Sequence, residues 1–563
     1  MTQPNDPTPQ PTPGNRPDGT DQTQSIPQSD TQAMPTHYDY PGAAGGGPET
    51  DPASTADVPE PAPGQAAAEG VPFSDDAGPK STRRRTGLVA AGLVGALALG
   101  GGIAFGVAQL SGDGAQPADV IPADALAYVR LDIDPSAGQK VAAVRFLNKI
   151  PEAKDILGAD DMRKELWDRV VQESQNACLA KFDFAKDIAP WLGERAGLGV
   201  RPGKTDGQQN LVVVLQTSDA AQASDTLTRL TACSTESDEQ TDVRTRDGYV
   251  LLTPKGQGDA TLAALDKGSL AGNSTFSGDM GALGDQGIAS MWFDAGKLAT
   301  QVDAPGPTVG GTALSSVQGR AAMTVRFDPD YIELAGIGRG QDAVKRVDGN
   351  GAELASLPAD TIGAVQLSGG AQLVDSAWPN LKKALDDLPG AGSGSDVSGM
   401  LEDQLGIKLP ADLAVLLGKS FTLAMPEQAL GSSLPTIGLK VAGTDAKRAE
   451  EVLTSLQDVS GGALQLDTKV DGDRLYAATT PGYTDALAQA GKLGDSDTFK
   501  TAIGDTSTMT GGVYLDLDRV EKYYLPEVGP EAHDALEALR AVGLNVSSTG
   551  DGEGTFSLRV VGN

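Results

Sequence analysis

The sequence predicts an α+β fold made twice, as a tandem duplication of a mainly antiparallel sheet with helices packed on one face of each copy. One transmembrane helix and a disordered N-terminal tail are predicted to precede the two copies. Three observations support this prediction. Residues 1–79 nearly lack branched aliphatic side chains, residues 88–110 carry no charge, and landmarks of residues 115–340 return in the same order in residues 353–563.

The N-terminal segment, residues 1–79, is rich in Pro, Gly, Gln, Thr and Asp, and Arg16 is its only basic residue. A segment of this composition cannot bury enough apolar area to offset the loss of chain entropy, so we predict a disordered cytoplasmic tail. A solvated linker is the simpler interpretation. The alternative is a signalling role in which phosphorylated hydroxyls bind a cytoplasmic partner. The candidate acceptors are Thr20, Thr23, Ser25 and Thr31.

The apolar segment 88–110 is long enough to cross a hydrocarbon core of about 30 Å at about 1.5 Å per residue. A basic flank, residues 80–87, lies before it, and Asp113 and Asp119 follow it. Because basic flanks stay in the cytoplasm, we expect a single-pass plasma-membrane protein with a cytoplasmic N-terminus and an extracytoplasmic C-terminal domain. The residues that determine this topology are Lys80, Arg83, Arg84 and Arg85.

The predicted topology and the charge of the chain limit its partners. The cytoplasmic membrane is the first partner. Small residues four apart, such as Gly92 and Ala96, allow two spanning helices to approach closely, so a homodimer through this helix is an alternative to a plain anchor. The formal net charge of −32 argues against nucleic acid, because a polyphosphate binds only where cationic side chains replace its counterions.

The region after the apolar segment contains an internal repeat, which is the sequence signature of a duplicated domain. Its landmarks keep their order and nearly their spacing. The corresponding segments are 121–131 with 357–367, 187–193 with 412–418, 246–254 with 471–481, 275–276 with 498–499, and 289–294 with 511–516. The polar, glycine-bearing segment 338–351 is the expected joint between the copies.

Each copy shows the periodicities of strands and helices in alternation. Ala127, Val129 and Leu131 fall on one face of their segment, which is the period of a half-buried strand. Helices are expected at 138–150, 160–175 and 373–388, and also from Ser218 and from Thr444-Asp445, where a polar residue can cap the helix. Asp247-Gly248 and Asp471-Gly472 predict tight hairpin turns. Strands are expected at 196–200, 211–216, 322–327 and 332–337, and at 421–425, 436–441, 544–548 and 555–560.

Two segments resemble a known family. They are Ile121–Asp134 (IPADALAYVRLDID) and Cys178–Arg195 (CLAKFDFAKDIAPWLGER), which follow the basic-flanked apolar segment. Together they are similar to the actinobacterial membrane proteins grouped as domain of unknown function 3352. The resemblance extends from about Arg83 to the C-terminus, and the segment ending in Pro-Trp-Leu-Gly-Glu-Arg is its most specific part. It implies the architecture above and supplies no activity, ligand or catalytic residue.

The only two cysteines, Cys178 and Cys233, both lie in the first copy. An even number in an oxidising compartment favours one disulfide, with free buried thiols as the alternative. The second copy lacks both, so the bond would be an addition to the shared fold. No Cys-x-x-Cys motif is present to support redox catalysis.

Motifs for catalysis, cofactors or metals are weak, and we expect none of the three. His37 lies in the tail, and His533 is interpreted as a surface residue of a helix; no Gly-x-Ser-x-Gly elbow supplies a nucleophile for it. Gly418-Lys419-Ser420 lacks the earlier glycine of a phosphate loop, because Leu413 stands there. Acidic pairs such as Asp132/Asp134 are interpreted as turn and cap residues rather than calcium ligands. The four tryptophans, Trp167, Trp191, Trp292 and Trp378, are expected in the core.

These observations favour a non-enzymatic binding or scaffold module of the cell envelope. A groove between the two lobes would hold a protein, peptide or lipid ligand. The alternative is an envelope hydrolase that uses carboxylates, which requires inward-facing Asp or Glu side chains with at least one raised pKa. No feature of the sequence selects a ligand, a reaction or an oligomeric state.

Overall fold

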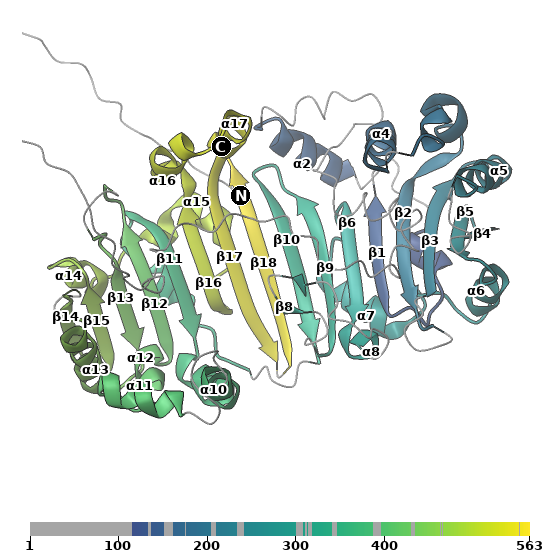
Figure 1. The fold of residues 1–563 in the computed structure, drawn as a ribbon. Helices are drawn as coiled ribbons and strands as arrows, with labels where there is room; N and C mark the ends of the chain where they lie inside the picture. The colour runs from purple at the N-terminus through teal and green to yellow at the C-terminus, as the bar shows by residue number, and fades with distance from the viewer. Residues whose placement is uncertain are drawn as a thin grey trace, which may run out of the picture. The chain divides into compact units, whose positions relative to one another are not determined.

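The computed structural model describes residues 115–563, apart from gaps at 133–136, 151–161, 175, 204–209, 234–240, 300–307, 310–311, 314–317, 341–345, 387–395, 430–433, 462, 464 and 551. A single antiparallel sheet of 16 strands dominates these residues (Figure 1). All of its strands belong to one compact unit of the chain.

Each copy contributes eight strands to this sheet. The first copy contains β1 (Ala127–Asp132), β2 (Leu192–Arg201), β3 (Asn210–Thr217), β4 (Thr241–Arg246), β5 (Tyr249–Pro254), β6 (Ala289–Asp294), β9 (Arg320–Phe327) and β10 (Tyr331–Arg339). The second contains β11 (Thr361–Ser368), β12 (Ser420–Pro426), β13 (Gly438–Ala442), β14 (Asp467–Asp471), β15 (Arg474–Ala478), β16 (Met509–Asp516), β17 (Leu539–Gly550) and β18 (Glu553–Gly562). A separate small hairpin joins β7 (Thr308–Val309) and β8 (Thr312–Ala313).

The strand order is the same when read from either end of the sheet. It runs β14-β15-β13-β12-β11-β16-β17-β18-β10-β9-β6-β1-β2-β3-β5-β4. The two halves meet where β10 pairs antiparallel with β18, from Tyr331 opposite Val561 to Arg339 opposite Glu553. We expected a sheet for each copy with a groove between the lobes. Instead, backbone hydrogen bonds fuse the copies edge to edge, so this expectation is wrong.

The helices of the first copy are α2 (Ala137–Leu147), α4 (Met162–Ser174), α5 (Ala220–Thr231), α6 (Gly258–Leu265), α7 (Ser274–Leu283) and α8 (Ala295–Ala299), with the short turns η1 (Pro117–Val120), η2 (Leu179–Lys181) and the π-helical η3 (Phe184–Ile188). Those of the second are α9 (Ala352–Ala355), α10 (Gly370–Asp386), α11 (Val397–Leu405), α12 (Ala411–Leu417), α13 (Ala446–Val459), α14 (Tyr483–Ala488), α15 (Asp497–Ile503), α16 (Leu517–Tyr524) and α17 (Pro530–Glu537), with η5 (Leu493–Asp495) and η6 (Leu525–Glu527). Asp445 caps α13 through a side-chain oxygen, as expected, whereas the cap of α5 is Asp219 and not the predicted Ser218.

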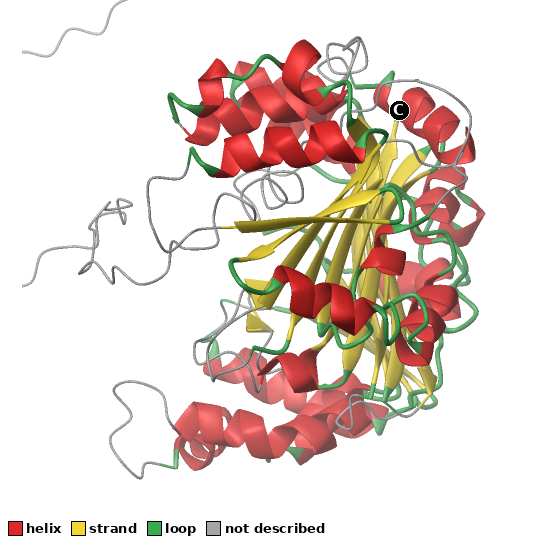
Figure 2. Cartoon of the chain, turned by 90° about the vertical axis from the view of Figure 1, so that its right-hand side faces the viewer, coloured by secondary structure: helices red, strands yellow, loops and turns green. Residues whose placement is uncertain are grey.

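Helices pack on both faces of the sheet rather than on one, which corrects the predicted layering (Figure 2). One face carries η1, α6 and α7 in the first copy and α9, α14 and α15 in the second, and its core contains Tyr128, Trp292 and Tyr514. On the other face, α4 and α5 cover one end of the sheet and α12 and α13 the other, while α2 packs on Phe327. We call the first the helix-covered face.

The membrane-spanning architecture also needs correction. Residues 88–110 were predicted to cross the plasma membrane, with residues 1–79 and the basic flank 80–87 inside. In the described part of the chain, no helix combines the length and the apolar character that a bilayer crossing requires. The predicted tail, flank and spanning segment all lie outside the described residues. The fold class is therefore a large antiparallel sheet with helices, and the single-pass topology and plasma-membrane location are withdrawn.

The structure tests two local predictions, the hairpin turn at Asp247-Gly248 and the burial of the four tryptophans. Asp247, with φ of 48°, and Gly248 form the tight turn between β4 and β5. Trp167, Trp191 and Trp292 are buried, whereas Trp378 on α10 is only half-buried, so its placement in the core was wrong. It lies on a helix that contacts α11 and α12 rather than the middle of the sheet.

Cys178 and Cys233 form a disulfide that joins two segments 55 residues apart in sequence, next to the apolar cluster beneath α5. In the chain-entropy description, closing a loop of this length stabilises the fold by about 4 kcal/mol. We expect the double variant Cys178→Ser/Cys233→Ser to lose that amount in urea unfolding, and the parent protein under reducing conditions to match it. Equal unfolding midpoints for oxidised parent and variant would contradict this expectation.

Candidate functional site: an open apolar face of the sheet

The face of the sheet opposite the helix-covered face carries three neighbouring rows of side chains, which the strand register defines. We call these rows the open face. The middle row consists of Leu423, Val365, Val513, Leu544, Leu558, Leu334, Val325, Ala289, Leu131 and Ala196. The lower row consists of Phe421, Leu367, Gly511, Val546, Phe556, Gly336, Met323, Met291, Val129 and Leu198, and the upper row of Met425, Gly363, Leu515, Val542, Val560, Ile332 and Phe327.

Every position of these rows is an apolar residue or glycine, across ten neighbouring strands from β12 to β2. At about 4.8 Å between strands, this width is roughly 43 Å. Solvent reaches the rows most strongly in the second copy, where Val365, Val513 and Val546 are exposed at 42%, 38% and 37%. In Figure 1 these strands, β11, β16 and β17, lie between α10–α13 and α2. Elsewhere helices cover the rows, as α2 does at Phe327 and α12 and α13 do at Phe421. The exposed valines therefore mark the accessible part of the open face, and exposed apolar side chains on neighbouring strands are typical of a binding or interaction site.

The helix-covered face of the same strands holds the polar side chains. In the first copy, Asp132 accepts from Arg195 Nε at 3.2 Å and forms an ion pair with Arg130, all three buried. At the same place in the second copy, Gln366 Nε2 donates to Ser368 Oγ at 2.8 Å. An antiparallel sheet ordinarily turns its polar side chains to water and its apolar ones to the core. In the middle of this sheet both faces depart from that pattern, because the helix-covered face combines the apolar core with buried charged groups and the opposite face is apolar as well.

A second buried network lies at the junction of the two copies. Glu333 on β10 accepts from Arg559 Nε at 3.0 Å and Ser557 Oγ at 2.6 Å, both on β18, and forms an ion pair with Arg326 on β9. Burial alone would raise the pKa of Glu333, but the donors outweigh it and hold the pKa below the usual range. This carboxylate therefore stays charged and links the two copies through side chains.

A third carboxylate on the helix-covered face has the same character. Asp279 on α7 accepts from Trp292 Nε1 at 2.9 Å, Arg320 Nε at 2.8 Å and Arg339 Nη1 at 3.0 Å. Its burial would raise the pKa, yet these donors together lower it. Asp132, Glu333 and Asp279 thus neutralise buried or partly buried arginines and connect elements of the fold.

Asp516 differs, because burial is the largest influence on this carboxyl and raises its pKa. Its role in the structure is local. Oδ1 accepts from the backbone N of Arg519 at 3.3 Å as the cap of α16, and Tyr514 Oη lies 3.2 Å from Oδ2. A carboxylate hydrolase needs a second carboxyl across a substrate cavity, and the cavity described below is lined by neither Asp516 nor Asp518.

A cavity of about 60 Å³ lies where the open face passes beneath α4. Leu131 and Ala196 of the middle row line it, together with Trp167, Trp191 and Leu227. Ligand pockets usually measure from about 300 Å³ upward, whereas a water occupies roughly 30 Å³. The cavity is therefore too small to hold a ligand of that size.

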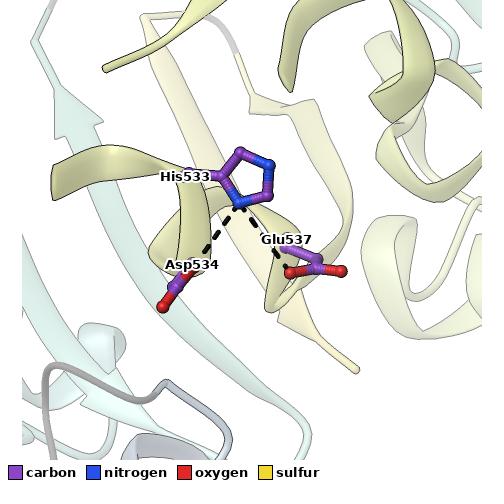
Figure 3. Close-up of side chains that lie close together, drawn as sticks. All are labelled: His533, Asp534 and Glu537. Carbon is purple, nitrogen blue, oxygen red and sulfur yellow. Dashed lines mark ion pairs between the residues drawn. The ribbon is translucent and has the colours of Figure 1, made fainter. Parts of the chain in front are cut away.

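The only group of three metal-type ligands found among the described residues is His533, Asp534 and Glu537 on α17. In Figure 3 the imidazole lies between the two carboxylates, with Nδ1 at 3.4 Å from Asp534 Oδ1 and 3.9 Å from Glu537 Oε2. All three belong to one eight-residue helix and are largely accessible to solvent. Exposed pairs of this kind contribute little.

The other candidate residues from the sequence either form part of the scaffold or lie outside the described residues. Gly418 ends α12 with φ of 53°, and Ser420 begins β12, so Gly418-Lys419-Ser420 forms a helix-to-strand turn. Lys80, Arg83, Arg84 and Arg85 lie outside the described residues. Sequence reasoning missed the residues of the open face. The signal was the alternation of apolar residues in successive strands, but alternation does not say which face the helices leave open.

Comparison with known proteins gives one match. A sequence model of the family described as "Protein of unknown function (DUF3352)" matches residues 87–274. The match therefore takes in β1–β5 of the first copy and ends at the start of α7, before the second copy. No curated protein and no solved structure matches the chain. The similarity supports a domain of unknown function; it does not show the actinobacterial and membrane-anchored setting that the resemblance implied.

Proposed function

We propose that this protein is a non-enzymatic binding module that holds the acyl chain of an amphiphilic ligand against the open face. The observation that carries the proposal is the wholly apolar second face of the sheet, whose three rows hold no polar side chain and leave Val365, Val513 and Val546 exposed. An acyl chain has no hydrogen-bonding groups, so it loses none on entering such a surface.

An extended peptide fits the open face less well. Each of its residues brings an N–H and a C=O group, and the apolar rows offer no side-chain partner for either. A buried backbone group without a partner costs about 1–3 kcal/mol. The backbone groups of β11, β16 and β17 are already used in the ladders on both sides. The chemistry of the rows therefore favours a ligand without a polar backbone.

The open face alone holds one acyl chain weakly. Full burial is worth about 0.8 kcal/mol per methylene, and a chain lying on a flat surface gains roughly half of that. A palmitoyl chain would then gain about 6 kcal/mol, from which association removes at least about 4 kcal/mol. Micromolar affinity, about 8 kcal/mol, requires a cover for the other side of the chain. The proposal thus includes a closed ligand-bound state.

Native mass spectrometry of the full chain tests this function. After delipidation and incubation with palmitate, we expect one or two palmitates to remain bound per chain, with a Kd in the micromolar range. Retention of no palmitate at a hundredfold higher concentration would contradict the proposal. A dimer that palmitate does not dissociate would also contradict it, because a second copy would then occupy the open face.

A further inference from the structure

We propose that α10 is the movable wall of this binding site and closes over Val365, Val513 and Val546 when an acyl chain is bound. This inference rests on the proposed function and names the cover which that function requires. It is carried by a difference between the two copies in the helix that follows the first strand.

In the first copy this helix is α2, which lies against the sheet. Its buried side chains, among them Phe146 and Leu147, pack on Ile288 and Phe327, with Val325 and Ile332 partly buried beside them. In the second copy the corresponding helix is α10, which packs mainly on α12 and α11. Figure 1 shows α10 beside these two helices at the lower end of β11. The helix that follows the first strand therefore lies in a different position in each of the two copies.

The register identifies Val546 as a residue that α10 leaves uncovered. Tyr128 of β1 corresponds to Ala364 of β11, and they pair with Trp292 and Tyr514. These two residues pair in turn with Ala322 of β9 and Gly543 of β17. Counting three residues onward, Val325 corresponds to Val546. Val325 is partly buried beside α2, whereas Val546 is exposed at 37%.

Helix α10 itself carries an apolar stripe that faces solvent. Leu373, Ala377 and Leu381 are four residues apart, so they lie along one side of the helix, and all three are exposed. Leu373 and Leu381 are exposed at 48% and 43%. An amphipathic helix with an uncovered apolar side lies near a sheet with uncovered valines. Closing one on the other, with a chain between them, removes both surfaces from water.

The start of α10 is a two-glycine junction at which the helix can pivot, held to the turn before β12 by backbone bonds from Gly369 N to Lys419 O (2.7 Å) and from Ala371 N to Gly418 O (2.8 Å). Gly369 joins β11 to the helix with φ of 67°, a conformation that favours glycine, and Gly370 follows it. The observed position is held by contacts with α12 and α11, which the movement has to break. Val374 is buried against the neighbouring helices, and Lys382 Nζ lies 2.8 Å from Asp396 Oδ1 in a solvent-exposed pair, which contributes little. A helix of 17 residues is about 25 Å long, enough to reach across several strands.

The movement is measured with two spin labels in the full chain. No cysteine is free in the described residues, so labels attach to Asp375→Cys on α10 and Thr549→Cys on β17, both exposed. We expect palmitate to shorten the distance between them by pulsed EPR. The matched control pair, Asp458→Cys on α13 with Thr549→Cys, is expected to stay unchanged. If palmitate bound but the distance between residues 375 and 549 stayed unchanged, the movement of α10 would be disproved and the proposed function would stand. If palmitate did not bind, both proposals would be disproved.

A substitution on α10 tests whether this helix forms part of the binding site. Leu373→Asp places a charge on the apolar stripe, and we expect it to weaken palmitate binding by roughly tenfold. Val459→Asp on α13 is the control, because Val459 has the same exposed fraction, 48%, and lies outside both surfaces. Its Kd is expected to stay within twofold of the parent. Equal affinities for Leu373→Asp and Val459→Asp would count against α10 as part of the site.

Discussion

Val513→Asp is expected to weaken palmitate binding by about a hundredfold or more. Val513 lies between Val365 and Leu544 in the middle row, so an acyl chain on this part of the open face contacts it. In the free protein the new carboxylate is hydrated, because the position is 38% exposed. In the complex it would be stripped of water against an apolar chain, at a cost of about 3 kcal/mol or more. Isothermal titration with palmitate measures the change.

Two controls accompany this measurement. Val513→Thr keeps the β-branched shape that suits a central strand, and we expect a much smaller loss of affinity. Val459→Asp adds the same charge on α13, away from the rows, and is expected to bind palmitate like the parent protein. If Val513→Asp folded with an unchanged thermal midpoint and bound palmitate with the parental Kd, the open face would not be the binding surface.

Glu333→Gln is expected to lower the free energy of unfolding by about 2–3 kcal/mol. The substitution keeps the volume of the side chain but removes the charge, so Arg326 and Arg559 face one another without a counter-ion. Breaking a buried pair on one side ordinarily costs about 3–5 kcal/mol, and the partial exposure of the two arginines reduces that cost. Urea unfolding measures the change. Glu553→Gln, which removes an exposed partner of Arg339 on the same strand pair, is the control and should cost little.

The same residue gives the stability a defined pH dependence. The pKa of Glu333 is lower in the folded protein than its usual value, so the unfolded chain binds the proton more readily. Its contribution is therefore complete above the usual pKa of glutamate, near 4.5, and is lost as the pH falls through the folded pKa. Asp279 and Glu353, whose pKa values are also lowered, act in the same direction. Glu333→Gln should lose stability less steeply in acid than the parent.

The sequence predicted the local elements of this fold better than their assembly. The repeated landmarks around Ile121 and Leu357 placed corresponding strands, and the polar turn at Asp247-Gly248 placed a hairpin. Such features depend on neighbours in the chain. The pairing of β10 with β18 depends on which sheet edges meet. The sequence of neither strand shows whether its free edge pairs with the other copy or faces water. For that reason a groove between lobes was expected where a continuous sheet exists.

The site was missed for a related reason. The alternation of Ala127, Val129 and Leu131 was recognised, and Val129 and Leu131 lie in the rows of the open face. Tyr128, Arg130 and Asp132 lie on the helix-covered face. Periodicity separates the two faces of a strand but does not say which one the helices cover. Hydrophobicity does not separate the two faces here, because the helix-covered face contains both the apolar core and arginines paired with aspartates. Only the three-dimensional register brings Val365, Val513 and Val546 together.

Photolabelling with a diazirine-bearing palmitate, followed by peptide mapping of the full chain, tests the central claim most directly. We predict that adducts fall on β11, β16 and β17 and on the exposed side of α10, and that unlabelled palmitate suppresses them. Adducts confined to the surface of α13, to α17 or to residues 88–110, with none on these strands, would contradict the claim that the open apolar face binds the ligand.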